Sequence, residues 1–209
     1  DRNALRLNDR VSLDEGVLLL DTLGTSSHGL RLAHAERAET ALVIGAGPVG
    51  MGAIAYLTAV GVPQVFVSEF SDYRLEIARQ YGAIPVNPAQ EDLPARIRDS
   101  HPYGVDLVVE AVGTLPTIWQ SCDLVRPGGT ISLLGEYWGK VELDRPKGTW
   151  MINDMTLIRS FYFTIPEFHE NQRMVLDGKL NAKALATHTF PLDEVKAAYD
   201  LFQTGNSLK

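Results

Sequence analysis

The stretch Ala41-Leu-Val-Ile-Gly45-Ala-Gly-Pro-Val-Gly50 decides the fold. Its first four residues are apolar and predict a buried strand, which runs into Gly-x-Gly-x-x-Gly and then into a helix with Pro48 at its first position. Gly45 permits the tight turn, Gly47 lets a pyrophosphate approach the backbone, and Gly50 lets the helix pack close to the strand. Because the free N–H groups of that helix would face the turn, the pattern predicts a phosphate-binding loop.

The rest of the chain repeats this strand and helix alternation. Short apolar runs predict strands over residues 41–45, 64–69, 84–86, 105–111, 130–135 and 156–161. Most of these runs are apolar throughout, which is typical of strands covered on both faces by helices. The sequence therefore predicts a Rossmann-type, doubly wound α/β domain with a parallel six-stranded sheet, flanking helices and right-handed crossovers.

An acidic residue, Glu69, ends the second predicted strand about twenty residues after Gly50. A carboxylate there can accept hydrogen bonds from both hydroxyls of an adenosine ribose and would repel a 2′-phosphate, which favours NAD over NADP. Arg74 could lie over the adenosine or reduce that repulsion. The alternatives are that Glu69 is a solvated loop acid and that Arg74 is an ordinary charge in the first turn of a helix.

Three polar residues, Asp21, Thr25 and His28, follow the apolar run 17–20 at spacings of four and three. In a helix they would project on one face. Carboxylate oxygen and imidazole nitrogen both suit zinc, which takes three protein ligands in catalytic sites, but two candidates do not complete a site. Asp21 could equally be a helix-capping or ion-paired acid, and His28 a hydrogen-bonded packing residue.

Two further segments lie outside the repeat. Residues 11–35 predict a helix that opens with Ser12 and Glu15 in capping-box spacing. Residues 166–204 predict two helices, and the second carries an apolar face made of Leu192, Val195, Tyr199 and Phe202.

Composition excludes several classes of protein. The 209 residues are 45% hydrophobic, enough for one packed domain with appendages. The 19 basic and 26 acidic residues give a net charge of −7 without a basic stripe, so we expect no nucleic-acid partner. The chain has no apolar run of membrane-spanning length and a single cysteine, Cys122, so we expect no membrane partner and a cytoplasmic location. It also lacks an initial Met, so we expect it to be part of a longer protein.

Several motifs together resemble the medium-chain dehydrogenase/reductase family, which comprises the zinc-type alcohol dehydrogenases and their polyol and threonine dehydrogenase relatives. The resemblance runs from about Val11 to Lys209 and covers only the later part of such an enzyme. The motifs that carry it are the 45–50 loop, Ser68-Glu69 followed by Arg74 and by Tyr81-Gly82-Ala83, Asp106-Leu-Val-Val-Glu110-Ala-Val-Gly113, Val125-Arg-Pro-Gly-Gly129 and the segment 190–199.

The resemblance implies roles for individual residues. The family's last ligand of the catalytic zinc is a Cys, Glu or Asp just before the dinucleotide domain, which matches Asp21. Thr25 and Val49 would pack against the nicotinamide. Thr25, together with His28 from the spacing argument, is a catalytic candidate. Backbone groups at Val112, Leu134 and, less directly, Phe161 would hold the carboxamide, although all three could simply be core residues; Glu136 is a weaker candidate beside them.

The family's other zinc ligands belong to an earlier, barrel-like catalytic domain that is mostly absent here, so they would lie outside this chain. Residues 1–35 would be a helical segment from that domain, 36–164 the NAD-binding domain, and 165–209 helices returning towards the catalytic domain. The implied enzyme transfers a hydride between NAD and a secondary alcohol, polyol or amino alcohol while zinc polarises the reacting oxygen. It would be a homodimer or homotetramer, and the fragment alone would be inactive.

Three alternatives remain. One is a zinc-free quinone or enoyl reductase that prefers NADPH, against which Asp21 and Glu69 both argue. The others are a non-catalytic dinucleotide-binding module and a methyltransferase that uses a similar glycine turn for S-adenosylmethionine.

Overall fold

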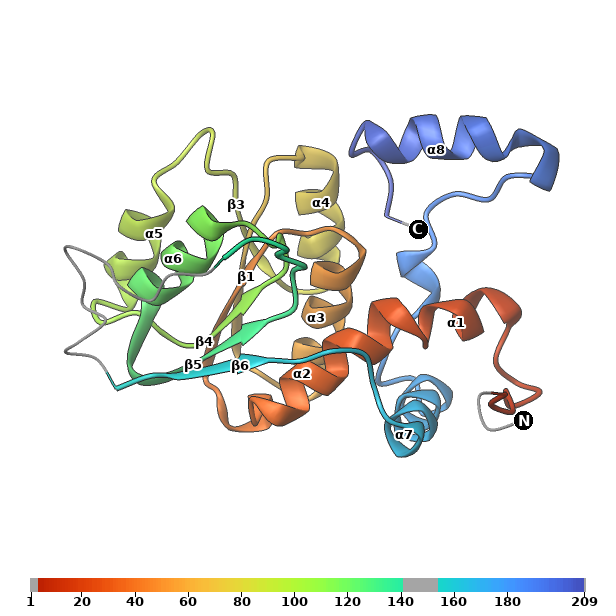
Figure 1. Ribbon diagram of the computed structural model, residues 1–209, viewed down its shortest axis with the longest axis horizontal. Helices are drawn as coiled ribbons and strands as arrows, with labels where there is room; N and C mark the ends of the chain where they lie inside the picture. The colour runs from red at the N-terminus through yellow and green to blue at the C-terminus, as the bar shows by residue number, and fades with distance from the viewer. Residues whose placement is uncertain (1–3, 141–153, 209) are drawn as a thin grey trace.

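The computed structural model describes residues 4–140 and 154–208. Its centre is a six-stranded parallel sheet in the order β3-β2-β1-β4-β5-β6 (Figure 1). This is the strand order of doubly wound dinucleotide-binding domains, so the predicted fold is confirmed. The strands are β1 (Thr40–Ile44), β2 (Gln64–Ser68), β3 (Ile84–Val86), β4 (Val105–Glu110), β5 (Val125–Leu133) and β6 (Thr156–Arg159).

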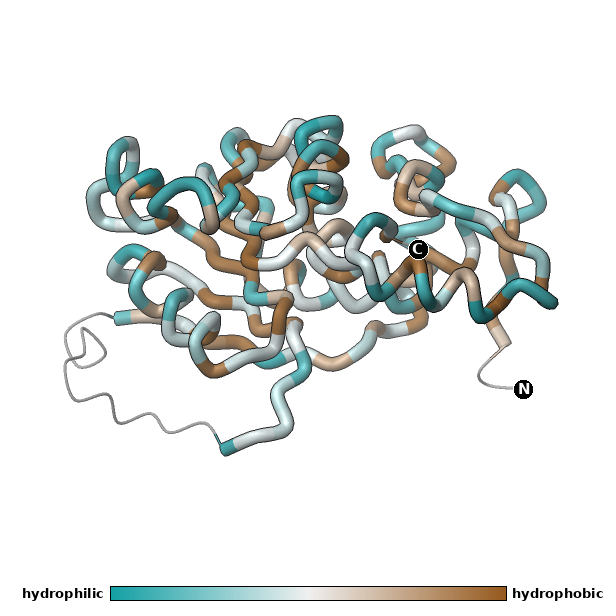
Figure 2. The backbone as a smooth tube through the Cα atoms, turned by 90° about the horizontal axis from the view of Figure 1, so that it is seen from above, coloured by the Kyte–Doolittle hydropathy of each residue, from teal (hydrophilic) through white to brown (hydrophobic). Residues whose placement is uncertain are grey.

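Helices cover both faces of the sheet because neighbouring residues of each strand point to opposite sides. Ala41 and Val43 of β1 belong to one hydrophobic core, and Leu42 and Ile44 to the other. The hydrophobic segments accordingly run through the interior in Figure 2. The covering helices are α3 (Pro48–Ala59) and α4 (Asp72–Gln80) on one side and α5 (Leu93–Ser100) and α6 (Leu115–Leu124) on the other.

Several strand ends differ from the sequence prediction by one or two residues, and the start of β5 differs by five. Strand β2 stops at Ser68, so Glu69 is the first residue of the following loop, and β6 stops at Arg159 instead of residue 161. Strand β5 begins much earlier than expected, because Val125 already pairs with Val105 and regular pairing resumes where Thr130 meets Leu107. The segment Pro127-Gly-Gly129 therefore forms an irregularity inside β5.

The segment 11–35 is not the single helix that its pattern predicts. It begins as expected, since Ser12 Oγ accepts from Glu15 N and the Glu15 carboxylate accepts from Ser12 N in a capping box. It then divides into α1 (Leu13–Leu18), the π-helical turn η1 (Asp21–Thr25) and α2 (Ser26–Leu32), with a short η2 (Ala35–Arg37) after it. A π-helical turn holds more residues than an α-helical turn, which changes the direction of every side chain after it.

The C-terminal part contains the two predicted helices, α7 (Ile165–Leu176) and α8 (Val195–Gln203), separated by the short turns η4 (Lys183–Leu185) and η5 (Leu192–Glu194). Helix α8 lies away from the sheet (Figure 1), and its predicted apolar face is exposed, with Tyr199 64% accessible. Throughout the described residues, every helix is too short or too polar to cross a lipid bilayer.

Candidate functional site

The candidate site lies at the carboxyl ends of β1 and β4. These strands are neighbours in the sheet, but the helices that follow them, α3 and α6, cover opposite faces of it. In doubly wound sheets, a ligand-binding crevice forms between two strands whose connections diverge in this way. The loops that follow are fixed by main-chain hydrogen bonds, from Gly45 N to Ser68 O at 2.8 Å and from Ala111 N to Ile44 O at 2.9 Å.

The glycine turn has the geometry that its spacing predicts. Gly45 has φ +91°, a left-handed conformation that favours glycine. A Cβ on Gly50 would lie only 1.9 Å from the Gly45 carbonyl oxygen, so only glycine allows α3 to pack this close to the turn. Gly47 faces open space, with no heavy atom within 4 Å of an added Cβ. Pro48 begins α3, so the free amides of this helix point to the same opening.

The first of two cavities beside this turn, the Glu69 cavity, has a volume of about 380 Å³. It is lined by five residues that the sequence predicts for the cofactor, by Ser68 of the Ser68-Glu69 motif, and also by Phe70, Thr117 and Gln120, which sequence reasoning did not find. The predicted residues are Gly45, Gly47, Glu69, Arg74 and Val112.

Glu69 connects the glycine turn to the loop after β2. Its Oε2 accepts from Ala46 N at 2.9 Å, and its Oε1 accepts from Phe70 N at 2.7 Å and from Ser71 N at 3.0 Å. Arg74 Nη1 lies 3.8 Å from Oε2, and only 12% of the Glu69 side chain is exposed. Glu69 is thus an ordered carboxylate in the cavity wall, which argues against the alternative of a solvated loop acid.

The second cavity, the Asp21 cavity, has a volume of about 390 Å³. Ala111 and Val112 line both cavities, so the two are adjacent along the strand ends. The structure gathers here every residue that the sequence analysis associates with zinc or the nicotinamide except His28: Asp21, Thr25, Val49, Val112, Leu134, Glu136 and Phe161.

Asp21 is positioned by η1. Thr25 Oγ1 donates to Asp21 Oδ1 at 3.2 Å, and Ser26 Oγ, in the next turn, donates to Val49 O at 2.7 Å, which fixes η1 against the start of α3. A carboxylate in this position suits zinc chemically. Within residues 4–140 and 154–208, however, no three His, Cys, Asp or Glu side chains come together as a metal site, so Asp21 fits the ion as one ligand only.

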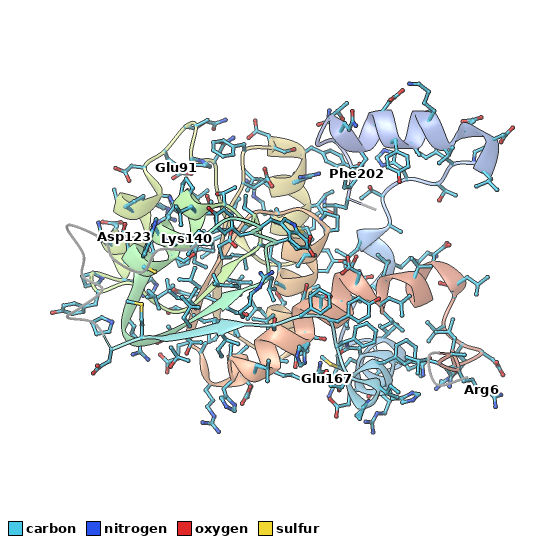
Figure 3. The ribbon with its side chains drawn as sticks, in the orientation of Figure 1. Arg6, Glu91, Asp123, Lys140, Glu167 and Phe202 are labelled. Carbon is cyan, nitrogen blue, oxygen red and sulfur yellow. The ribbon has the colours of Figure 1, made fainter. Side chains whose placement is uncertain are left out.

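His28 is turned away from Asp21. Its Nδ1 lies 3.0 Å from both carboxylate oxygens of Glu167, so the pair joins α2 to α7. Glu167 is labelled in Figure 3. Burial raises the pKa of Glu167, but hydrogen bonds from His28 and from the Thr164 amide and hydroxyl outweigh it and hold the pKa below its ordinary value. The expectation that Asp21, Thr25 and His28 share one face is therefore wrong for His28, because the π-helical turn shifts its direction.

Three further residues line the Asp21 cavity: Arg159, Ser160 and Tyr162. Arg159 and Ser160 are not apparent from the sequence, whereas Tyr162 is one of the aromatic residues that the sequence offers for a substrate pocket or a subunit interface. Arg159 donates to the Gly135 carbonyl, and the only available signal was a charged residue at the end of an apolar strand. Tyr162 has φ +64°, an uncommon conformation for a residue with a side chain, and backbone strain of this kind often occurs at functional sites.

Comparison with known proteins agrees with this geometry. Residues 48–177, more than half of the chain, match the family model described as zinc-binding dehydrogenase. The chain is 29% identical to the probable D-xylulose reductase A of Aspergillus clavatus, over 98% of this chain and 58% of that protein. It is 33% identical to the L-threonine 3-dehydrogenase of Pyrococcus abyssi, over 82% of this chain and 50% of that protein.

Among solved structures, the alcohol dehydrogenase from Thermus sp. ATN1 superimposes with a TM-score of 0.91 at 29% identity. That match covers 98% of this chain and 59% of the Thermus chain. The chain thus spans between half and three-fifths of the length of these three relatives.

Proposed function

This chain belongs to the zinc-binding dehydrogenase family, and from that premise we propose that it is the NAD-binding portion of a zinc-dependent alcohol dehydrogenase. The whole enzyme would transfer a hydride between NAD and a secondary alcohol, polyol or amino alcohol. The observation that carries the proposal is the pair of adjacent cavities along the strand ends, one lined by the glycine turn and the Glu69 carboxylate and the other by the Asp21 carboxylate.

Different residues of this chain would bind the different parts of NAD. The amides at the start of α3 and the open face of Gly47 take the pyrophosphate, and Glu69 and Arg74 take the adenosine ribose. Val49, Val112 and Leu134 surround the nicotinamide in the Asp21 cavity. Bound there, NAD supplies the hydride acceptor and the protein supplies its orientation.

A direct binding measurement tests the cofactor. Isothermal titration calorimetry of this chain with NAD, NADP and S-adenosylmethionine is expected to give the tightest binding to NAD, because a 2′-phosphate would meet the Glu69 carboxylate. Tightest binding of NADP would instead support a reductase of the zinc-free branch. Tightest binding of S-adenosylmethionine would overturn the dehydrogenase assignment.

We also propose Asp21 as one protein ligand of a catalytic zinc ion, with the other ligands outside this chain. When bound, zinc would supply a Lewis acid that polarises the alcohol or carbonyl oxygen of the substrate. Thr25, which donates to Asp21, would hold that carboxylate in place, and the carboxylate itself would carry the negative charge that the ion requires.

Substitution of Asp21 tests this assignment. In the enzyme that contains this chain together with the remaining ligands, Asp21→Ala is expected to lower zinc content and zinc affinity by about 10-fold to 100-fold or more, measured by elemental analysis and by competition with a chelator. Asp14→Ala, which removes an acid from the first turn of α1, is the matched control. Full zinc occupancy in Asp21→Ala would contradict the assignment.

The same proposal predicts how the domains and subunits of the whole protein are arranged. Residues 1–35 and 165–209 would belong with the catalytic domain, and 36–164 would form the NAD-binding domain. The exposed apolar face of α8 supports a further part of the protein that covers this helix.

We propose a homodimer or homotetramer, with the edge strand β6 and exposed Phe161 near the subunit contact. A cytoplasmic setting fits the single cysteine. Light scattering of the full-length protein tests the assembly, and a monomer would refute it.

A further inference from the structure

Glu110, the last residue of β4, is a carboxylate that the roles assigned so far do not use. It is completely buried, at the end of a strand whose preceding residues Leu107, Val108 and Val109 are apolar core. Burial of a charge is costly, and an apolar residue at such a place is often at least as stable. The position of Glu110 therefore needs an explanation other than stability.

The side chain of Glu110 holds the loop that follows it. Its Oε1 accepts from Val112 N at 3.0 Å, from Gly113 N at 2.8 Å and from Thr117 Oγ1 at 2.8 Å. Its Oε2 is buried and has no hydrogen-bond partner within the described part of the chain; a Cβ on Gly135 would lie 2.7 Å from it. A single oxygen thus fixes two consecutive amides of the loop and the first turn of α6.

This loop is the wall that the two cavities share. Ala111 and Val112 line both the Glu69 cavity and the Asp21 cavity, whereas Glu69 and Arg74 line only the former. The Glu110 main-chain oxygen also accepts from Leu134 N at 2.8 Å and from Gly135 N at 2.9 Å, and both of these residues line the Asp21 cavity. Glu110 is therefore bonded to two separate segments of the Asp21 cavity wall without lining either cavity.

We propose that Glu110 is a positioning residue for the nicotinamide half of the cofactor. Its side chain fixes the 111–113 loop, and this loop sets the path of the dinucleotide from the Glu69 cavity into the Asp21 cavity. The proposal rests on the proposed function, since it assumes a nicotinamide dinucleotide in the cleft. It adds that the length of the side chain at position 110, and not the charge of that side chain, governs binding of the nicotinamide half of the cofactor in the Asp21 cavity.

The test compares NADH, which would occupy both cavities, with AMP, which would occupy the Glu69 cavity alone. Calorimetry on the whole chain gives both affinities, and NADH fluorescence reports the environment of the nicotinamide. Glu110→Ala and Glu110→Asp are expected to weaken NADH binding by about tenfold or more, because the Val112 and Gly113 amides lose their acceptor. AMP binding is expected to fall clearly less than NADH binding, because Glu69 and the glycine turn are unchanged and only Val112 and Thr117 of the Glu69 cavity lose a contact with Glu110.

Two further variants separate positioning from stability. Glu110→Gln keeps the length and one oxygen acceptor, so its NADH affinity is expected within about threefold of wild type. Asp106→Ala is the matched control: Asp106 is a carboxylate on the same strand that accepts from Glu39 N and Thr40 N at the opposite end of the sheet. Its loss is expected to lower the melting temperature without changing the ratio of NADH to AMP affinity. Should Glu110→Ala not fold, the comparison of Glu110→Asp with Glu110→Gln decides the question.

The outcomes distinguish this inference from the proposed function. Wild-type protein that binds neither NADH nor AMP would overturn the proposed function and this inference with it. Wild-type binding, combined with equal losses of AMP and NADH in Glu110→Asp or an equal NADH loss in Asp106→Ala, would overturn the inference alone. A Glu110→Gln variant as weak as Glu110→Asp would also overturn it, because charge and not length would then govern binding.

Discussion

Replacing Glu69 by Ala removes the carboxylate that we propose binds the adenosine ribose. The structure indicates two separate consequences. The ribose loses a charged acceptor, and three backbone amides, at Ala46, Phe70 and Ser71, lose the acceptor that now holds them at 2.7 to 3.0 Å. The first effect changes cofactor affinity, whereas the second loosens the glycine turn even in the absence of cofactor.

The expected loss of NAD binding is about 1–3 kcal/mol, the usual range for hydrogen bonds to a charged group, or about 5-fold to 150-fold in Kd. NADP should respond in the opposite direction. At an effective dielectric constant of 20, two unit charges 4 Å apart interact by about 4 kcal/mol. Removal of the Glu69 carboxylate therefore relieves its repulsion of the 2′-phosphate of NADP, which Arg74, 3.8 Å from Glu69, only partly offsets. We therefore expect NADP affinity to stay constant or to rise.

Calorimetry with NAD and NADP on wild type and Glu69→Ala provides the assay, with thermal melts to record the stability effect. Glu76→Ala is the control. Glu76 lies on α4, the helix that follows the Glu69 loop; its side chain is 55% exposed and lies outside the Glu69 cavity. If Glu69→Ala binds NAD as tightly as wild type, or if it weakens NAD and NADP equally, the role assigned to this carboxylate is wrong.

Two more predictions concern packing and pH. Gly50→Ala places a Cβ 1.9 Å from the Gly45 oxygen and should cost about 1–3 kcal/mol of stability in a denaturant titration. The Cβ of Gly47→Ala meets no atom, so this variant should unfold like wild type but bind NAD more weakly. Equal stability of the two variants would refute the packing argument. Because the pKa of Glu167 is lowered in the folded state, its contribution to stability is present above the ordinary value of 4.5 and is lost as the pH falls through the lower folded value. Thermal melts between about pH 3 and pH 7 should therefore show wild type losing more stability than Glu167→Gln on acidification, and parallel curves would exclude the contribution.

Several features of this protein follow from short stretches of its sequence. The left-handed conformation of Gly45, the close packing at Gly50 and the capping box at Ser12 depend on residues only a few positions apart, and the sequence predicts all three. The strand order could also be expected, because right-handed crossovers between buried parallel strands leave few alternatives. Even the location of Glu69 is set locally, by the end of one strand.

Other features depend on contacts between distant segments, and only the tertiary structure decided them. The Asp21 cavity combines η1, the start of α3 and the ends of β4, β5 and β6, and the family resemblance supplied its members without their arrangement. The π-helical turn that directs Asp21 inwards and His28 towards Glu167 is not encoded in any helical spacing. Glu110 appeared in the sequence as one letter of a strand motif, and its three donors became visible only when the loop and α6 closed around it. The physical reason is that a hydrogen-bonding pattern along one element is set by its own residues, whereas the direction of a side chain into a cleft is set by what packs against that element.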